Sequence, residues 1–479
     1  MIVIFVHGWS VTDTNTYGLL PEAMAKQSTL YGLDIEIKHL WLGRYISFND
    51  TVNMGDIVRA FDSALRDVIP EGSDPEAGGI AEFSCITHST GGPVVREWLD
   101  RYYGSANLSQ SPLRHLIMLA PANHGSPLAA LGKQRVGRIK AWFDGVEPGQ
   151  LILNWLSLGS QQQIDLSTSY LDYKPVANHF YPFVLTGQSI DKKFYDFVNS
   201  YLAEPGSDGV VRVSGANMNF TKVKLVESDT TDTVVHGTEE LEVNLLKLVD
   251  SAQRPEPVAL GVIPNASHSG KDKGIMRSII SDKSKKPQLA EILKCLQVDS
   301  AAKYKARKQA LAALTQQTQK STKRYSNLVF VLTDDQSEPI TDYDIVLLGG
   351  QERDPNKLTK GFFVDRQKNA ASPNHLIYYI NYDVIIKSQL TGIRIIARPT
   401  QGFSFYHAVE YRFEQEEINT LLQPNETLYV SIEIQRRVDQ AVFLLDEAGD
   451  PKLRKEGVIF KHETRHDFKN QKVINKQVD

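Results

Sequence analysis

The chain contains the octapeptide Ile86-Thr87-His88-Ser89-Thr90-Gly91-Gly92-Pro93. It lies between an apolar strand-like run, Phe83 to Thr87, and a helix-like segment, Val94 to Tyr103. A serine on a tight strand-to-helix turn has strained backbone angles, so its close neighbours must be small, and its hydroxyl projects above the sheet. The start of the following helix also favours negative charge that develops nearby. The octapeptide therefore predicts that Ser89 is a nucleophile. Thr87 stands where glycine is usual, so this motif alone is only moderately specific.

Short β-branched runs alternate with amphipathic segments from Met1 to about Ser281. This alternation is typical of a parallel sheet covered by helices. The runs are nearly continuous in apolar residues, as central strands buried on both faces must be. The clearest runs are Ile2 to Val6, Phe83 to Thr87, His115 to Leu119, Phe183 to Thr186 and Val258 to Ile263.

The 479 residues exceed what one compact core usually organises, so we expect two domains. The first, over 1–290, is of the α/β class. Within it, at about 126–181, apolar residues cluster without strand alternation and predict inserted helices, either a lid over an acyl channel or an ordinary packed layer. A basic, helix-prone linker is expected over 291–325, either as a solvated connecting helix or as a contact for anionic lipid. Short strands separated by turn signals predict an all-β, sandwich-like domain over 326–445, followed by a charged tail over 446–479.

The composition excludes several classes of protein. With 41% hydrophobic and 23% charged residues, the chain is close to an ordinary soluble globular protein. A formal net charge of −4 gives no global field suited to binding nucleic acid. Only two cysteines occur, Cys85 and Cys295, so a disulfide framework is excluded, although a single bridge is not. Cys85 is interpreted as a buried structural thiol.

The N-terminus does not have the pattern of a signal peptide. Met1 to Val6 form an apolar run with no basic residue before it and no small-residue cleavage site after it. No uninterrupted apolar stretch approaches the roughly 20 residues that a membrane-spanning helix needs. We therefore expect synthesis in the cytoplasm and, if the protein acts outside the cell, export by a route without a cleaved leader.

Loops after other predicted strands supply candidate oxyanion-hole amides and a candidate catalytic acid. His7-Gly8-Trp9 ends the first strand, where an oxyanion hole needs free backbone amides, and the N–H groups of Trp9 and Thr90 are the candidates. Ser207-Asp208-Gly209-Val210-Val211 places an acid, Asp208, on a loop, where it would hold an imidazole in its productive tautomer.

The general base is predicted to be His268, in the loop Asn265 to Gly270 that follows the last apolar run. His236 stays open as an alternative because it is nearer to Asp208 in the sequence. His88 is a poorer candidate, since it adjoins the nucleophile and should point elsewhere. Serine, then aspartate, then histidine is the order that α/β-hydrolases show.

These residues resemble bacterial lipases of the α/β-hydrolase superfamily over roughly the first 280 positions. The resemblance implies a sheet with a helical lid and carboxylic-ester hydrolysis without a metal or other cofactor. It places the nucleophile on Ser89, the acid on Asp208, the base on His268 and the oxyanion amides on Trp9 and Thr90. The departures are Thr87 and the long spacing from Asp208 to His268. The motifs that carry the resemblance are Val6-His7-Gly8, His88-Ser89-x-Gly91-Gly92, Ala120-Pro121-Ala122-Asn123-His124-Gly125-Ser126-Pro127 and Ser207-Asp208-Gly209-Val210-Val211.

The expected substrate is a lipid ester, with transient contact to a membrane surface. Two alternatives stay open: an esterase or thioesterase for short soluble substrates, and a binding protein on a silent hydrolase scaffold. The β-rich domain can dock a membrane, a sugar or a protein partner, or simply stabilise the fold. A lipase without a leader, followed by a β-rich domain, also looks like the phospholipase effectors delivered by type VI secretion.

Overall fold

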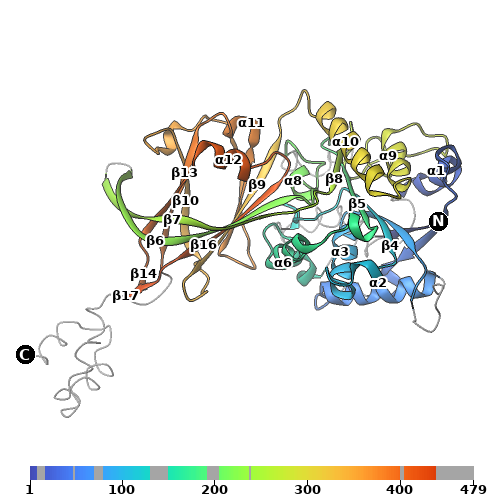
Figure 1. The fold of residues 1–479 in the computed structure, drawn as a ribbon, viewed down its shortest axis with the longest axis horizontal. Coiled ribbons are helices and arrows are strands. Elements are labelled where there is room, and N and C mark those ends of the chain that lie inside the picture. Colours follow the sequence, from blue (N-terminus) through green and yellow to red (C-terminus); the bar gives the residue numbers. More distant parts are fainter. Residues whose placement is uncertain are drawn as a thin grey trace, which may run out of the picture.

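Two β-sheets organise the chain, and they lie at opposite ends of the elongated view in Figure 1. The computed structural model describes residues 1–7, 17–46, 49–69, 79–129, 149–190, 204–236, 239–399 and 404–438. Part of the predicted insertion, 130–148, and the predicted tail, 446–479, lie outside the described residues.

The first sheet has six strands in the order β2-β1-β3-β4-β5-β8, and all neighbouring strands are parallel. In β1, Ile4 and Val6 point into one core, whereas Val3 and Phe5 point into a second core on the opposite face. Burial on both faces explains why these strands are apolar throughout. The predicted α/β-hydrolase sheet is confirmed. Its strands are β1 (Ile2–His7), β2 (Glu36–Trp41), β3 (Phe83–His88), β4 (Leu113–Leu119), β5 (Tyr181–Thr186) and β8 (Ala259–Val262).

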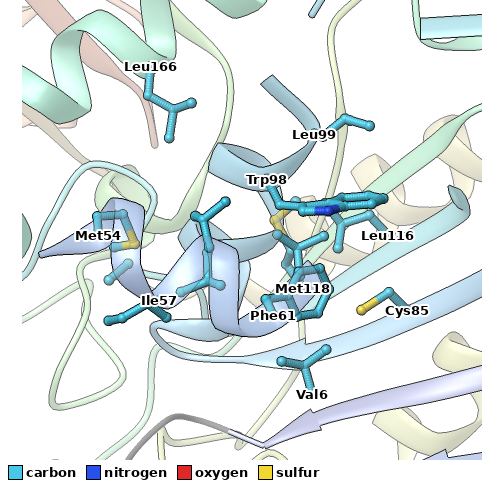
Figure 2. Close-up of a cluster of buried hydrophobic side chains, with 14 of the residues drawn as sticks. Val6, Met54, Ile57, Phe61, Cys85, Trp98, Leu99, Leu116, Met118 and Leu166 are labelled. Atoms are coloured by element: carbon cyan, nitrogen blue, oxygen red, sulfur yellow. The ribbon is translucent and has the colours of Figure 1, made fainter. Parts of the chain in front are cut away.

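Helices α2 and α3 cover one face of this sheet (Figure 2). The helix α2 begins at a capping box in which Asn53 and Asp56 satisfy each other's backbone N–H groups. Phe61 of α2 meets Trp98 of α3 edge to face, with ring centroids 5.5 Å apart. Cys85 lies in the same core, and its burial raises the pKa of the thiol, so the predicted buried thiol is confirmed. The helices on this side are α2 (Met54–Val68), α3 (Gly91–Tyr102), α5 (Gln150–Leu156) and α6 (Gln161–Ser169).

The opposite face is covered by α1, α9 and α10. Tyr304 and Leu311 of α10 are buried against the sheet, and the Tyr304 hydroxyl donates to Pro182 O at 2.8 Å. The segment predicted as a linker over 291–325 therefore packs against the six-stranded sheet through a minority of its residues. The basic composition of α10 hid this role: Lys303 and Lys305 are exposed, whereas Tyr304, Arg307 and Leu311 are buried. The bounds are α1 (Leu20–Gln27), α9 (Pro287–Leu296) and α10 (Ala301–Thr318).

The second sheet has nine strands in the order β10-β13-β15-β7-β6-β16-β9-β12-β11. It is a single sheet that curls around one core, since the Tyr378 hydroxyl of β12 donates across the core to Ile345 O of β10 at 2.7 Å. The predicted β-rich region is confirmed as a large C-terminal sheet. Its elements are β6 (Phe220–His236), β7 (Glu239–Gln253), β9 (Tyr325–Asp334), β10 (Asp342–Gly349), β11 (Phe363–Lys368), β12 (His375–Asn381), α11 (Tyr382–Ile385), β13 (Leu390–Arg398), β15 (Ala408–Arg412), α12 (Gln415–Leu421) and β16 (Thr427–Ile434). A separate pair joins β14 (Ser404–Phe405) to β17 (Arg437–Val438).

The hairpin of β6 and β7 precedes residue 290 in the sequence, but its two strands lie in the middle of the second sheet (Figure 1). The boundary expected at residue 290 therefore does not separate the two sheets. Val223 and Leu225 of β6 face the second core, but the strand then continues through the polar run 228–233, which hides its strand character in the sequence. None of the helices in the described ranges has the length and apolar composition needed to cross a bilayer.

Candidate active site

Ser89 lies on the turn between β3 and α3 with a backbone φ of +53°. This left-handed angle is uncommon for a residue other than glycine and marks a strained turn. The neighbouring space is small, because a Cβ atom added to Gly92 would lie 2.8 Å from Pro121 Cβ. Thr87 fits despite its size because Gly91 faces it: a Cβ on Gly91 would lie 3.3 Å from Thr87 Cβ. The turn has the form predicted for a nucleophile elbow.

The structure brings Ser89, His268 and Asp208 together, although 179 residues separate the first two. Ser89 Oγ lies 3.1 Å from His268 Nε2, and His268 Nδ1 lies 3.0 Å from Asp208 Oδ2. A proton on Nδ1 is donated to the carboxylate, which leaves Nε2 able to accept the serine proton. The imidazole and the carboxylate are both almost fully buried.

The Asp208 carboxylate is held by its own loop. Its second oxygen, Oδ1, accepts the N–H groups of Val210 at 3.0 Å and Val211 at 2.8 Å. The backbone N–H of His268 in turn donates to the carbonyl oxygen of Asp208 at 3.0 Å. The acid and the base are therefore connected through both side chain and backbone, which fixes the direction of the imidazole.

His88 supports His268 from behind. Its Nε2 donates to the carbonyl oxygen of His268 at 3.1 Å, and the two ring centroids are 4.7 Å apart. Burial and then the nearby His268 hold the pKa of His88 well below its ordinary value, so the ring is neutral near pH 7. The His88 ring is hydrogen-bonded to the backbone of His268, which agrees with the prediction that His88 is not the base.

Of the two residues predicted to form the oxyanion hole, one lies among the described residues. Thr90 directly follows Ser89 and is the N-cap of α3, where backbone N–H groups point out of the helix. Trp9, the other candidate, lies outside the described residues. Within the described ranges, no group of three or more His, Cys, Asp or Glu side chains is placed to hold a metal ion.

Neither a protein-family model nor a curated protein matches the sequence. Among solved structures, the mature form of the lipase BlEst2 from Bacillus licheniformis matches at 20% identity, covering 45% of this chain and 78% of its own, with a TM-score of 0.32. Two structures of phospholipase PlaB from Legionella pneumophila, one in complex with thio-NAD, are each 44% identical to this chain. Each match covers 92% of this chain and 95% of PlaB, with a TM-score of 0.79.

The chain belongs to the PlaB family. The predicted resemblance to bacterial lipases and phospholipases of the α/β-hydrolase superfamily is thereby confirmed, and so is the prediction of a carboxylic ester hydrolase. The likeness to type VI secretion effectors stays a prediction.

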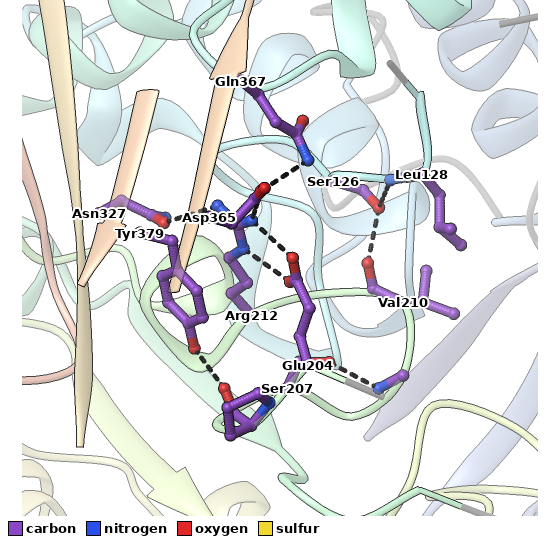
Figure 3. Close-up of polar contacts among 12 residues, drawn as sticks. Ser126, Leu128, Glu204, Ser207, Val210, Arg212, Asn327, Asp365, Gln367 and Tyr379 are labelled. Carbon is purple, nitrogen blue, oxygen red and sulfur yellow. Dashed lines mark hydrogen bonds and ion pairs between the residues drawn. The ribbon is translucent and has the colours of Figure 1, made fainter. Parts of the chain in front are cut away.

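In this member of the PlaB family, the loop that carries Asp208 is held between the two sheets by Arg212 (Figure 3). The Arg212 guanidinium, 1% exposed, binds Glu204 through two nitrogens, at 2.9 and 2.8 Å. It also binds Asp365 of β11 at 2.6 Å and lies 4.1 Å from the ring centroid of Tyr379 in β12. The second sheet therefore contacts the acid loop four residues from Asp208.

Two further contacts fix the same loop. The Tyr379 hydroxyl donates to Pro205 O at 2.8 Å, and the Ser126 hydroxyl donates to Val210 O at 2.6 Å. Gly206 has a φ of +77°, and a Cβ atom there would lie 2.3 Å from the Tyr325 ring, so only glycine fits. The sequence gives no signal for the role of Arg212, because an arginine on a loop is far more often exposed than buried.

The alternative base His236 ends β6, where it pairs with Glu239 across the hairpin. Its side chain is not among those described. The strands β6 and β7 extend away from the parallel sheet into the second sheet (Figure 1). His268, and not His236, is the histidine beside Ser89.

Proposed function

We propose that this chain hydrolyses carboxylic esters of phospholipids through an acyl-enzyme formed on Ser89. The observation that carries the proposal is the hydrogen-bonded chain from Ser89 Oγ through His268 to Asp208, buried at the strand ends of a parallel sheet in a member of the PlaB family. The named activity of PlaB supports phospholipids as the substrate class. Membrane contact, export and a protein partner of the β-rich domain stay predictions.

In the proposed first step, His268 Nε2 takes the proton of Ser89 as Oγ attacks the ester carbonyl. The N–H groups of Thr90 and Trp9 receive the negative charge on the carbonyl oxygen. The imidazolium then gives its proton to the leaving alcohol, and Asp208 stabilises the charge on the ring. Water activated by the same imidazole attacks the acyl-enzyme and releases the fatty acid.

Substituting Ser89→Ala tests the nucleophile. We expect hydrolysis of a chromogenic acyl ester and of phospholipid vesicles to fall by about 10⁴-fold or more, because the group that forms the covalent bond is removed. Ser281→Ala, at an exposed serine, is the matched control and should keep full activity. Turnover by the Ser89 variant near the level of the control would contradict the proposal.

The two alternatives are separated by substrate choice and labelling. A phospholipase should release fatty acid from vesicles and prefer long acyl chains, whereas a short-chain esterase or thioesterase should lose rate as the chain lengthens. A binding protein on a silent scaffold should not react with a fluorophosphonate probe. Labelling that disappears in the Ser89→Ala variant, with fatty acid identified as product, is the outcome we expect.

A further inference from the structure

Two buried arginines lie close to one tyrosine ring. Arg96 of α3 is 1% exposed, and Arg254, which follows β7, is 6% exposed. Their guanidinium carbons lie 4.9 and 5.7 Å from the ring centroid of Tyr170. Stacking on an aromatic face attracts each cation, but it supplies no negative charge.

Among the described residues, neither arginine forms an ion pair, and their hydrogen bonds are incomplete. Arg96 Nη1 donates to the carbonyl and side-chain oxygens of Asn123, at 3.3 and 3.1 Å, but its Nε has no partner. Arg254 makes no hydrogen bond through Nε or Nη1. Burial, followed by the charge of Arg96, lowers the pKa of Arg254 to about 10, so Arg254 still carries a positive charge at pH 7. Arginine side chains such as Arg96 are not deprotonated in proteins.

The nearby acids are engaged elsewhere. Glu97 pairs with Arg101 at 2.7 Å, Asp100 accepts the hydroxyl of Tyr173 at 3.1 Å, and Glu256 accepts the N–H of Val176 at 3.1 Å. Buried charges in proteins are normally paired, because an unpaired one loses its hydration without compensation. The two buried cations therefore have no carboxylate in direct contact among the described residues, and Glu256 acts on Arg254 only through its charge.

Arg254 lines a cavity of about 430 Å³ between the base of the β6–β7 hairpin and the segment from α12 to β16. This volume is in the range of small-molecule sites. The amide group of Gln253, in the same wall, already donates to Thr221 and Thr420, so Arg254 is the main donor left. Glu426 is the one acid in the described lining, and burial raises its pKa to about 7, so it can be neutral beside an anion.

We propose that this cavity binds phosphate or a phosphate monoester, with the Arg254 guanidinium as its principal ligand. A guanidinium donates charge-assisted hydrogen bonds to phosphate oxygens. The second charge, on Arg96, favours a dianion over a monoanion. The site is separate from Ser89, and it does not depend on the proposed function.

The test uses the full-length protein and inorganic phosphate. Phosphate should raise the thermal unfolding temperature with saturation, relative to sodium chloride at equal ionic strength, because a ligand that binds only the folded state stabilises it. Arg254→Gln should remove the saturable part. Arg44→Gln, which loses the same charge at an exposed position, should keep it. Isothermal titration calorimetry with both variants gives the affinities directly, and we expect at least a tenfold loss in Arg254→Gln.

Two more ligands define the class. Glycerol 3-phosphate that binds more tightly than inorganic phosphate would identify the head group of a lipid as the source, and the reverse order would identify free phosphate. Equal responses of the wild type and Arg254→Gln, or acetate binding as tightly as phosphate, would overturn the proposal. If Arg254→Gln does not fold, Arg254→Lys replaces it: the guanidinium is lost while the positive charge stays, so phosphate must bind several-fold more weakly, and unchanged affinity overturns the proposal.

Discussion

Arg212 and Arg254 are both buried arginines at the boundary between the two sheets, but their surroundings differ. Burial lowers the pKa of Arg212, and the hydrogen bond and charge of Glu204 more than offset this, so its pKa is raised. Arg254 has no such carboxylate, and its pKa is lowered. The first arginine joins the acid loop to the second sheet, whereas the second faces a cavity. The difference shows that the burial of a charged side chain alone does not reveal its role, since the partners decide it.

Arg212→Ala removes the side chain that joins the acid loop to the second sheet. Glu204 and Asp365 would lose their common partner, and breaking such a buried pair costs about 3 kcal/mol or more of unfolding free energy. We also expect kcat to fall by at least tenfold with KM little changed, because Asp208 would be held less firmly behind His268. Denaturant unfolding and steady-state kinetics on an acyl ester measure both effects.

Arg324→Ala is the control for Arg212→Ala. Arg324 also joins a carboxylate, Asp383, but it is partly exposed and far from Asp208 in the sequence. Its loss should lower stability slightly and leave kcat unchanged. If both variants lose activity in proportion to stability, Arg212 has only a structural role. A kcat that recovers partly in Arg212→Lys would support a positioning role.

Tyr379→Phe tests a second contact between the second sheet and the acid loop. The ring would stay under the Arg212 guanidinium, while the hydrogen bond from the hydroxyl to Pro205 O would be lost. Removing one such bond costs about 1 kcal/mol. We expect that loss in the denaturant midpoint and a decrease of a few-fold in kcat. An unchanged kcat would indicate that Arg212 alone holds the loop.

The sequence predicts the parts of the site whose signals are local. Ser89 was found because a strand, a small turn and a helix follow one another, and His268 because it follows the last parallel strand. The strand pairing of the second sheet was not predictable in the same way. Phe220 pairs with Thr427, some two hundred residues later, and the local sequence of neither strand identifies the strand that it pairs with. The partners of Arg212 in the second sheet are equally distant, so neither its burial nor its ion pairs could be inferred.

The smallest expected effect is that of Arg254→Gln in phosphate-free buffer. Removing an unpaired buried charge deletes a desolvation cost and breaks no ion pair, so the free energy of unfolding should change by no more than about 1 kcal/mol, in either direction. Denaturant unfolding beside Arg212→Ala measures this contrast directly. A loss as large as that of Arg212→Ala would mean that Arg254 has a strong partner within the folded chain, and the two buried arginines would then be equivalent. A small change without phosphate, together with a large difference in its presence, would show that the counter-charge of Arg254 comes from a ligand.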